Sequence, residues 1–536
     1  MAVPKDNPFM EKIVSLCKRR GFIYPSSEIY GGINGFWDYG PLGAELKRNV
    51  KDLWWNATIR RRDDVVGLDA TIIMSPKIWQ ASGHVDTFSD PMIDCKTCQG
   101  RFRADQTGEI PCPKKPGKCV SECDGEKTAP RAFNLMFQTY VGPVRDDSAI
   151  AYLRPETAQA IFAQFKNVLE TTRQKVPFGI AQVGKAFRNE VTPRNYTFRS
   201  REFEQMELEF FIKPDEVVEA IAGRVAKAGE LVPNSQLPTP NSDWGWEAWH
   251  KYWVEQRLAF YESIGLPRTT LEEYWQKPAE LAHYARACVD LLFKFPFGTQ
   301  ELEGIAARSD FDLSQHERFS GKAMGVFDEE LRAAWSQLPR EKQDELRRRY
   351  YEHRKQYLAK MARPGETPEQ VDKAAREDAD GLAKGQYLPH VIEPSAGVDR
   401  LMLALICHAY HEDQMPDEKG RLETRIVMKF HPRVAPIKVA VLPLLKNKPE
   451  LVKTARQVHE LLRPWMNVFY DDAGAIGRRY RRQDEAGTPF CVTVDFDTLG
   501  EKPELKDTVT VRFRDDGRQE RLKISELRDW LLVKIR

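Results

Sequence analysis

Arg188 and Glu190, two residues apart, are the first candidates for chemistry in this 536-residue chain. Alternate residues of a strand project from the same face, so the pair would set a phosphate-binding cation beside a hydrogen-bond acceptor. The segments FGIAQVGKAFRNE and YTFRSREFEQMELEFF have the pattern of an antiparallel hairpin with a long tip around Pro193. We therefore expect the functional site to lie on this hairpin.

The returning strand combines carboxylates with bulky apolar residues on both faces. Its four glutamates are Glu202, Glu204, Glu207 and Glu209. Burial of such acids is costly unless cations meet them, because a desolvated carboxylate takes up a proton or destabilises the fold. Arg188, Arg199, Arg201 and a ligand ammonium could supply those cations. An exposed amphipathic strand with solvated acids explains the same composition.

A second candidate is the turn EPSAGVDR at 393–400, where a strand pattern ends and a helix pattern begins. Helix N-termini favour anions. Gly397 would allow close approach of the backbone, and Arg400 would add a forked donor set for phosphate. The alternative is a capped helix with a surface arginine.

A third candidate is a metal site in residues 95–128, which are rich in Cys, Lys, Pro and Gly. Five of the nine cysteines lie there: Cys95, Cys98, Cys112, Cys119 and Cys123. The C-x₂-C pair at 95–98 has good zinc spacing, but the second half contains no other C-x₂-C. We expect a structural zinc held by Cys95, Cys98 and two of the other three. The alternative is a degenerate knuckle with free thiols.

The composition limits the class of protein. The residues are 41% hydrophobic and 30% charged, as in globular proteins, and the length suggests about three or four domains. The formal net charge of +2 excludes a protein that coats nucleic acid indiscriminately. The N-terminal residues lack the apolar core of a secretory signal, and no apolar stretch is long enough to span a bilayer, so we expect a cytoplasmic enzyme. Walker-A and Rossmann spacings are missing, so side chains would have to hold any nucleotide phosphates.

The elements around these candidates follow from the hydrophobic pattern. Three tryptophans at helical spacing, Trp246, Trp249 and Trp253, indicate a helix that packs its aromatic face, in preference to an RNA-stacking platform. Residues 311–385 are strongly charged and helical, which predicts a solvated insertion, with tRNA contact as a minor alternative. From 434 to 536, strand and helix patterns alternate as in a compact α/β domain.

These motifs resemble those of class II aminoacyl-tRNA synthetases, specifically the homodimeric type of glycyl-tRNA synthetase. FRNE and FRSREFEQME are similar to the second class motif, and EPSAGVDR is similar to the third. The blocks GGINGFWDYGPLGAELKRN, SGHVDTFSDPM, NLMFQTYVGPV, YLRPETAQAIF and ELEGIAARSDFDL match the glycyl family in the same order. The resemblance covers nearly the whole chain.

The resemblance implies an α+β catalytic domain built on an antiparallel sheet flanked by helices, the class II synthetase fold. That domain would comprise residues 1–310 and 386–433, with the Cys-rich insert at 95–128 within it. Residues 311–385 would be the helical insertion, and residues 434–536 an α/β anticodon-binding domain.

The implied reaction has two steps. Glycine and ATP would give glycyl-adenylate and pyrophosphate, and the glycyl group would then pass to the 3′ end of tRNA(Gly). The implied partners are tRNA(Gly), glycine, ATP, Mg²⁺ and a second copy of the chain, with no membrane or DNA partner. A non-catalytic tRNA-binding protein and an amino-acid ligase with a non-tRNA acceptor are alternatives. The arginines and acidic residues argue against the first, and the C-terminal domain argues against the second.

The resemblance also assigns site residues by motif position. The catalytic arginines would be Arg188 and Arg400. The ATP contacts would be Arg188, Asn189, Glu190, Phe198, Arg199, Glu202, Phe203, Glu301, Leu302, Gly397, Asp399 and Arg400. The glycine contacts would be Arg103, Glu156, Phe203, Glu204, Gln205, Met206, Glu207, Glu393, Ser395 and Gly397. Glu301 and Glu393 would hold Mg²⁺, and RRYRR at 478–482 would contact the tRNA backbone.

Acidic glycine contacts make physical sense. Glycine has no side chain to grip, so its affinity must come from the ammonium and the carboxylate. One carboxylate–ammonium contact is worth roughly 4 kcal/mol before desolvation at an effective dielectric of about 20. A steric wall would exclude alanine, and because no amino acid is smaller than glycine, no editing domain is expected.

Overall fold

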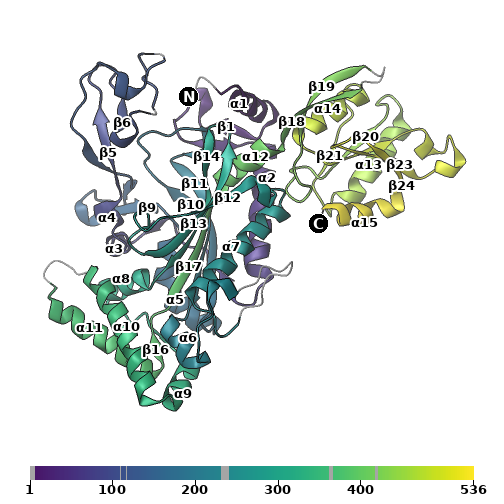
Figure 1. Ribbon diagram of the computed structural model, residues 1–536. Coiled ribbons are helices and arrows are strands. Elements are labelled where there is room, and N and C mark those ends of the chain that lie inside the picture. Colours follow the sequence, from purple (N-terminus) through teal and green to yellow (C-terminus); the bar gives the residue numbers. More distant parts are fainter. Residues whose placement is uncertain are drawn as a thin grey trace.

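Figure 1 shows a computed structural model, which describes residues 7–108, 110–115, 117–230, 241–360, 366–416 and 421–535. A central body is built on a long twisted sheet. A Cys-rich projection rises at the upper left of the view, a helical projection hangs at the lower left, and the C-terminal domain lies at the right.

The central sheet has seven strands in the order β12-β13-β14-β17-β11-β10-β3. Every neighbouring pair is antiparallel except β10 and β3, which are parallel. The strands are β3 Val65–Gly67, β10 Phe178–Phe187, β11 Glu202–Ile212, β12 Leu271–Trp275, β13 Ala285–Phe295, β14 Gly298–Arg308 and β17 His390–Gly397. The predicted antiparallel sheet and the β10–β11 hairpin are therefore confirmed.

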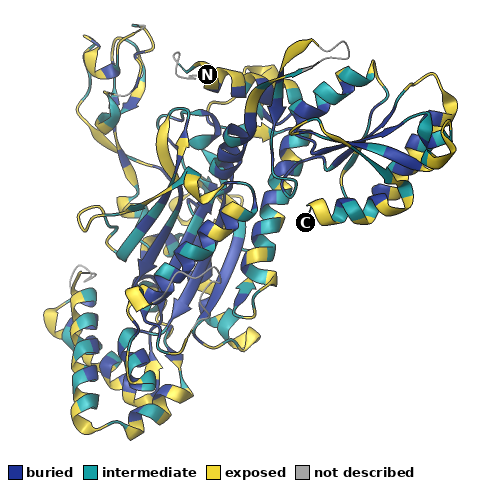
Figure 2. Ribbon diagram, turned by 45° about the vertical axis from the view of Figure 1, so that its right-hand side comes forward, coloured by how far each residue is buried: buried dark blue, intermediate teal, exposed yellow. Residues whose placement is uncertain are grey.

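One face of this sheet carries the main apolar core. Helices α7 (Trp246–Ser263) and α12 (Val398–Ala409) pack on it, and α2 (Pro41–Trp55) packs on α12. The ring of Phe210 on β11 lies 4.8 Å from that of Trp249 and 5.1 Å from that of Trp253. The tryptophans of α7 are thus core residues, as predicted. Figure 2 shows the sheet buried over most of its length.

The opposite face is covered only at one end. Helix α5 (Ala158–Thr172) packs there, with the ring of Phe165 4.4 Å from that of Phe211 and 6.0 Å from that of Phe178. Towards the other end of β11, the same face carries Phe203, Gln205 and Glu207, which line a cavity. The topology therefore leaves a binding surface on the face opposite α7 and α12.

The helical projection consists of α9 (Glu329–Gln337), α10 (Arg340–Lys360) and α11 (Pro368–Gly381), and α8 (Phe311–Ser320) precedes it. The prediction of a helical insertion is correct in secondary structure, but the expectation that residues 311–385 are simply solvated is wrong. Helix α8 packs against α5, and Leu313, Leu346 and Tyr350 share one core with β10 and β11. The inner faces of these helices are therefore part of the protein core, and they also bury polar side chains such as Arg354 and Asp312.

The Cys-rich projection is built on a three-stranded sheet of β5 (Ser89–Asp94), β6 (Arg101–Arg103) and β7 (Arg131–Asn134), so it extends beyond the predicted bounds of 95–128 on both sides. Its small core is made of Ile93, Phe102, Ile110 and Val120 together with cysteines. So few apolar residues give little stabilisation by themselves, as predicted for a segment that needs a metal.

The C-terminal domain has a five-stranded sheet in the order β21-β20-β22-β23-β24, with its own core. Its elements are β20 Val439–Pro443, α13 Pro449–Leu462, β21 Val468–Tyr470, α14 Ile476–Ala486, β22 Phe490–Val494, β23 Thr508–Phe513, β24 Gln519–Lys523 and α15 Ile524–Ile535. The hairpin β18 (Tyr410–Pro416) and β19 (Leu422–Met428) joins it to the body, because Arg425 donates to Asp484 at 2.9 Å. The predicted α/β domain is confirmed.

Two of the arginines in RRYRR serve this domain internally. Arg479 is 1% exposed and donates to the carbonyl of Leu444 at 3.0 Å. Arg482 pairs with Asp471 at 2.6 Å. The prediction of tRNA contact is therefore wrong for Arg479, whose side chain is buried, whereas Arg482 is partly exposed and Arg478 is exposed.

The remaining short elements connect these layers. They are α1 Pro8–Arg20, β1 Ile23–Pro25, β2 Trp37–Tyr39, β4 Ile73–Met74, α3 Pro76–Ala81, α4 His84–Thr87, β8 Gln138–Tyr140, β9 Ile150–Leu153, α6 Asp215–Ala222, β15 Val326–Phe327 and β16 Gln386–Tyr387. No helix in the described ranges has the length and apolar character needed to cross a membrane.

Candidate functional site

The open face of the central sheet holds a cavity of about 330 Å³. Strands β11, β13, β14 and β17 contribute residues to its lining, as do the tip of the β10–β11 hairpin and the start of α12. Most of the predicted site residues line it: Glu156, Arg188, Glu190, Phe198, Arg199, Phe203, Gln205, Glu207, Glu301, Leu302, Glu393, Ser395, Gly397, Asp399 and Arg400. The hairpin and the turn at 393–400, nearly 200 residues apart, meet because β11 pairs with β17.

One part of the cavity is formed by arginines and aromatic rings. The guanidinium carbon of Arg188 lies 5.3 Å from the ring centre of Phe203 and 5.4 Å from that of Phe88. Its Nε donates to the carbonyl of Pro155 at 3.0 Å, which fixes one edge of the group. These contacts hold the guanidinium in one orientation before any ligand binds, so little conformational entropy is lost when a ligand binds to it.

Glu190 provides a buried acceptor near this arginine. Its side chain is mostly buried, and Oε2 has no hydrogen-bond partner among the described residues. The nearest cation is Arg199, whose Nε lies 3.7 Å from Oε2, beyond hydrogen-bond distance. A buried carboxylate oxygen without a donor is suited to accept from a ligand N–H.

Arg400 stands at the start of α12. Its Nη1 donates to Oε2 of Glu301 at 3.1 Å and to the Glu301 carbonyl at 3.2 Å. The guanidinium carbon lies 4.6 Å from the ring centre of Phe198. Arg188 and Arg400 are thus two oriented cations on one cavity, an arrangement suited to a polyphosphate.

The opposite part of the cavity is acidic and buried. Glu156 accepts from Gln159 at 3.2 Å and lies 3.2 Å from His84 Nε2. Burial alone would raise the pKa of Glu156, but His84, Arg308 and Arg188 together lower it to about 2. This carboxylate therefore stays ionised at neutral pH.

Glu207 lies in the same region and accepts a hydrogen bond from Thr157. Its pKa is raised by burial and by the charge of Glu156, while Thr157 and Ser395 hydroxyls lower it. Glu156 and Glu207 therefore bring two acidic groups together in a buried part of the cavity.

Arg308, which the sequence did not single out, is the central cation of this region. It pairs with Glu393 at 2.7 Å and with Asp312 at 3.0 Å, and its guanidinium carbon lies 3.8 Å from the ring centre of Tyr284. The segment IAARSDFDL contains Arg308 and Asp312 at helical i,i+4 spacing, but only the pairing of β14 with β17 brings them to Glu393.

Glu209 is a further buried acid in this cluster. Ligand atoms of Glu207, Glu209 and Glu393 lie within 4.8 Å of one another, and neither carboxylate oxygen of Glu209 has a hydrogen-bond partner within the described chain. Burial and then the neighbouring Glu393 raise the pKa of Glu209 well above its usual value. Burial and the neighbouring Glu207 and Glu156 also raise the pKa of Glu393 to about 8, against the effect of Arg308. We interpret Glu209, which contacts no cation among the described residues, as the member of the cluster that takes up a proton first. Because side chains alternate along a strand, Glu209 lies on the same face of β11 as Glu207.

The other face of β11 corrects three predictions. Glu202 pairs with Lys185, Glu204 pairs with Lys47 at 2.8 Å, and Met206 is fully buried in the core under α12. Residues at even positions of β11 point away from the cavity because strand side chains alternate. The prediction that these three side chains contact ligand is therefore wrong.

Two further predicted contacts lie outside the cavity lining. Arg103 is held by Asp90 and Asp105, each at 2.8 Å. Asn189 lies in the chain between Arg188 and Glu190, and its backbone N–H donates to the carbonyl of Leu135 at 2.7 Å. The structure does not bring either side chain to the cavity surface.

The predicted magnesium pair is separated. Glu393 is opposite Ala306 in the β14–β17 ladder, and Glu301 lies five residues further along β14, roughly 15 Å away. Glu393 is also engaged by Arg308, whereas Glu301 lies beside Arg400. The prediction that Glu301 and Glu393 hold one ion together is wrong, and Glu301 alone remains at the arginine-rich part.

Four cysteines converge in the insert. The Cys95 thiol is in hydrogen-bonding reach of those of Cys98 and Cys123, and Cys112 is in reach of Cys123. The backbone N–H of Cys98 is the largest of the effects that lower the pKa of Cys95 to about 7. At Gly125, a Cβ would lie 2.8 Å from Cys95 Sγ, so glycine keeps the sulfur accessible.

The fifth cysteine has a different role. Cys119 precedes a short 3₁₀ turn and caps its N-terminus with its side chain. Thiolates that receive backbone N–H bonds are the usual ligands of a tetrahedral zinc. The four neighbouring thiols are therefore the candidate ligands for such an ion.

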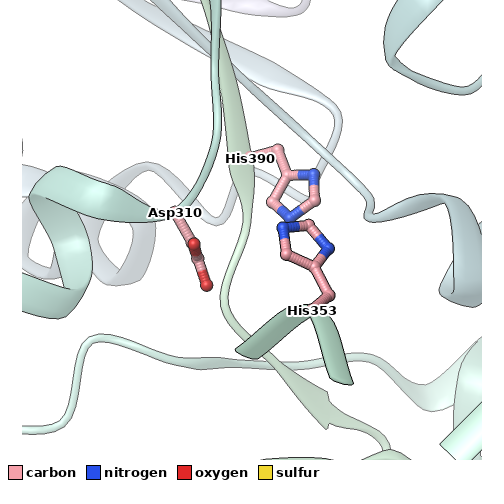
Figure 3. A group of neighbouring side chains, drawn as sticks. All are labelled: Asp310, His353 and His390. Carbon is pink, nitrogen blue, oxygen red and sulfur yellow. The ribbon is translucent and has the colours of Figure 1, made fainter. Parts of the chain in front are cut away.

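A second group of possible ligands, Asp310, His353 and His390, joins α8, α10 and β17 (Figure 3), with one ligand atom of each within 4.8 Å of the others. Arg354 pairs with Asp310, and Arg286 Nη2 lies 2.8 Å from His353 Nδ1. Burial, reinforced by Arg286, lowers the pKa of His353 to about 4. A dication would meet two guanidinium cations there, so we interpret the group as a contact that docks α10 on the sheet.

Comparison with known proteins gives the same organisation. Residues 142–234 match the family described as tRNA synthetase class II core domain (G, H, P, S and T), and residues 438–534 match the family described as anticodon binding domain. A glycine–tRNA ligase of Thermobifida fusca (strain YX) is 43% identical over 539 residues, which cover 98% of both chains. A glycine–tRNA ligase of Thermus thermophilus is 43% identical over 570 residues, covering 98% of this chain and 99% of its own.

Proposed function

Because the chain belongs to the glycine–tRNA ligase family of class II aminoacyl-tRNA synthetases, we propose that it uses ATP to attach glycine to the 3′ end of tRNA(Gly). The observation that carries this proposal is the division of one cavity into an arginine-rich part and a buried acidic part. The first suits a triphosphate, and the second suits a small ammonium.

The first step joins glycine to the α-phosphate of ATP. An oxygen of the glycine carboxylate forms a bond to the α-phosphorus, and the bond from that phosphorus to the bridging oxygen of pyrophosphate breaks, so pyrophosphate leaves with the electron pair. The carboxylate is already ionised and needs no general base. Catalysis then depends on positioning the reactants and on stabilising charge at the phosphorus.

The arginine-rich part supplies that stabilisation. Arg188 would bind the α-phosphate, and its contact with the Phe203 ring holds the guanidinium in place. Glu190 would accept from the adenine amino group through its unpartnered oxygen, while Phe203 stacks on the base. Arg400 would bind the γ-phosphate.

Magnesium fits beside Arg400. Glu301 is half exposed at this point and can offer a carboxylate oxygen to an ion that is also bound by the phosphates. Bound Mg²⁺ would neutralise phosphate charge during the displacement.

The acidic part would receive glycine. Glu156, Glu207 and Glu393 surround the space for the ammonium, and Ser395 lies beside Glu207 in the β11–β17 ladder. Glu209 stays protonated beneath them, which limits the total negative charge. Glu156 is held ionised, and Arg308 and the ligand ammonium are the cations that meet this acidic cluster.

In the second step a hydroxyl oxygen of the terminal ribose of tRNA would form a bond to the glycyl carbonyl carbon. The bond from that carbon to the phosphate oxygen would break, so that AMP leaves with the electron pair and the hydroxyl proton passes to the AMP phosphate or to solvent. The C-terminal domain would bind the anticodon end of the same tRNA, with Arg478 as an exposed contact for the backbone. The body and this domain are held together through Arg425 and Asp484.

The insert would bind a structural zinc ion through Cys95, Cys98, Cys112 and Cys123. When bound, the ion would cross-link the two halves of a segment whose apolar core is small.

The protein would act as a homodimer in the cytoplasm. Ile29, Tyr30 and Ile33 are large apolar side chains with 87%, 88% and 55% exposure, which supports a protein partner at this surface.

Aminoacylation tests the overall function. We expect purified protein to charge total tRNA with glycine, and to charge it with alanine and serine about 100-fold more slowly, because a steric wall beside the glycine α-carbon would exclude a side chain. Radiolabelled amino acids measured in parallel would give the rates. Equal charging with alanine or serine would refute the specificity. Glycyl-adenylate formation without any tRNA charging would favour a ligase with another acceptor.

Arg188→Ala tests the phosphate contact. We expect glycine-dependent ATP–pyrophosphate exchange to fall by about 10²- to 10³-fold, because the loss of one preorganised donor set at a developing charge costs about 3–4 kcal/mol. Arg131→Ala is the control, since Arg131 is a surface arginine paired with Asp94 at 2.7 Å. Near-normal exchange by a folded Arg188→Ala protein would contradict the assignment.

Metal analysis tests the insert. Purified protein should contain one zinc per chain, and Cys95→Ser should lose it and unfold at a lower temperature. Cys119→Ser should keep the metal, because its side chain lies outside the quartet. Zinc retained by Cys95→Ser, or lost by Cys119→Ser, would overturn this ligand set.

A further inference from the structure

A buried network of charges lies behind the arginine-rich part of the cavity and includes two residues with no assigned role, Lys47 and Tyr39. Lys47 on α2 donates to Asp399 Oδ1 at 2.9 Å and lies 2.8 Å from Glu204 Oε2. Tyr39 on β2 donates to the same oxygen of Asp399 at 2.5 Å. The network therefore connects the N-terminal segment with β11 and α12.

The charges in this network are largely removed from water. The exposed fractions of the side chains are 12% for Lys47, 8% for Asp399 and 13% for Glu204. Burial by itself would lower the pKa of Lys47, but Asp399 and Glu204 raise it above its ordinary value. Lys47 thus remains a cation shared by two carboxylates. Its removal would leave Asp399 buried without the lysine that neutralises it, while Glu204 would keep its contact with Lys51.

Asp399 is the point at which this network reaches the site. It lies in the first turn of α12, and its Oδ2 accepts the backbone N–H of Glu204 at 2.7 Å. One carboxylate therefore holds the start of α12 against β11 and, through Lys47 and Tyr39, against the N-terminal segment. The residue before the helix, Gly397, has no side chain that could cap it.

The residue after Asp399 is Arg400, which reaches the cavity from the same helical turn. A shift or rotation of this turn would move the guanidinium away from Phe198 and Glu301. Because fixed donors must match phosphate oxygens within fractions of an ångström, small displacements cost affinity.

We propose that Lys47, assisted by Tyr39, is a positioning residue for the triphosphate contact of Arg400. The proposal rests on the proposed function, since it takes Arg400 as a ligand of ATP. Lys47 acts through Asp399 and lies on the opposite side of β11 from the cavity, so it touches no substrate. The acidic part of the cavity contains no member of this network, so glycine binding should be spared.

The chain offers a matched control on the same helix. Lys51 lies one turn after Lys47 and contacts Glu204 at 3.0 Å. It is more exposed than Lys47, and no contact with Asp399 is recorded for it within the described residues. Lys51→Met therefore removes one lysine and one ion pair of Glu204 without releasing Asp399.

The test compares Lys47→Met, Lys51→Met and the unchanged protein in ATP–pyrophosphate exchange, below the unfolding temperature of each. For Lys47→Met we expect the KM for ATP to rise at least 10-fold and the KM for glycine to stay within twofold. For Lys51→Met both constants should stay within twofold. Lys47→Arg, which keeps the charge, should recover part of the ATP affinity.

Several results would overturn the proposal: an ATP KM for Lys47→Met equal to that of Lys51→Met, equal rises in the KM values for ATP and glycine, or a lower unfolding temperature with unchanged kinetics. If Lys47→Met does not fold, Tyr39→Phe decides, because it removes only one hydrogen bond to Asp399. An ATP KM raised two- to fivefold supports the proposal, and an unchanged value refutes it. Absence of exchange in the unchanged protein would refute the proposed function instead.

Discussion

Buried negative charge is the constraint on which the site depends. Glu156, Glu207, Glu393 and Asp312 lie around one arginine, Arg308, in a region with little access to water. Ionised carboxylates in such a place are stable only if cations or protons meet them. Arg308 neutralises part of the charge, and a proton on Glu209 neutralises another part. The remaining charge makes the region selective for a small cation, and the amino acid with the smallest side chain gives an ammonium the closest approach.

The antiparallel sheet separates this acidic region from the arginines that would bind ATP. Strands β11 and β17 run through both parts, so Glu207 and Ser395 face each other in the ladder while Gly397 lies opposite Gln205. The same alternation directs Glu204 and Met206 to the other face, where α2 and α12 bury them. The cavity and the helix packing thus lie on opposite faces of one strand, and the Lys47 network lies between the two.

The sequence predicts local features well and distant pairings poorly. The hairpin, the turn at 393–400 and the C-x₂-C pair follow from spacing, because they depend on neighbours in the chain. Motif position did not separate the two faces of β11, so Glu204 and Met206 were included among the glycine contacts. Arg308 has a local partner in Asp312, but Glu393 lies 85 residues further along the chain, and no local pattern indicates that the two meet. The wrong magnesium pair has the same origin, since the register of β14 against β17 cannot be read from either strand.

The glycine KM of Glu207→Gln, measured with that for ATP in the exchange reaction, tests most directly whether buried carboxylates bind the ammonium. The substitution keeps the size of the side chain and removes its charge. Loss of one partner from a buried charge pair costs about 2–5 kcal/mol. We therefore expect the glycine KM to rise about 100-fold, with the ATP KM within twofold. A glycine KM that does not change would contradict the account.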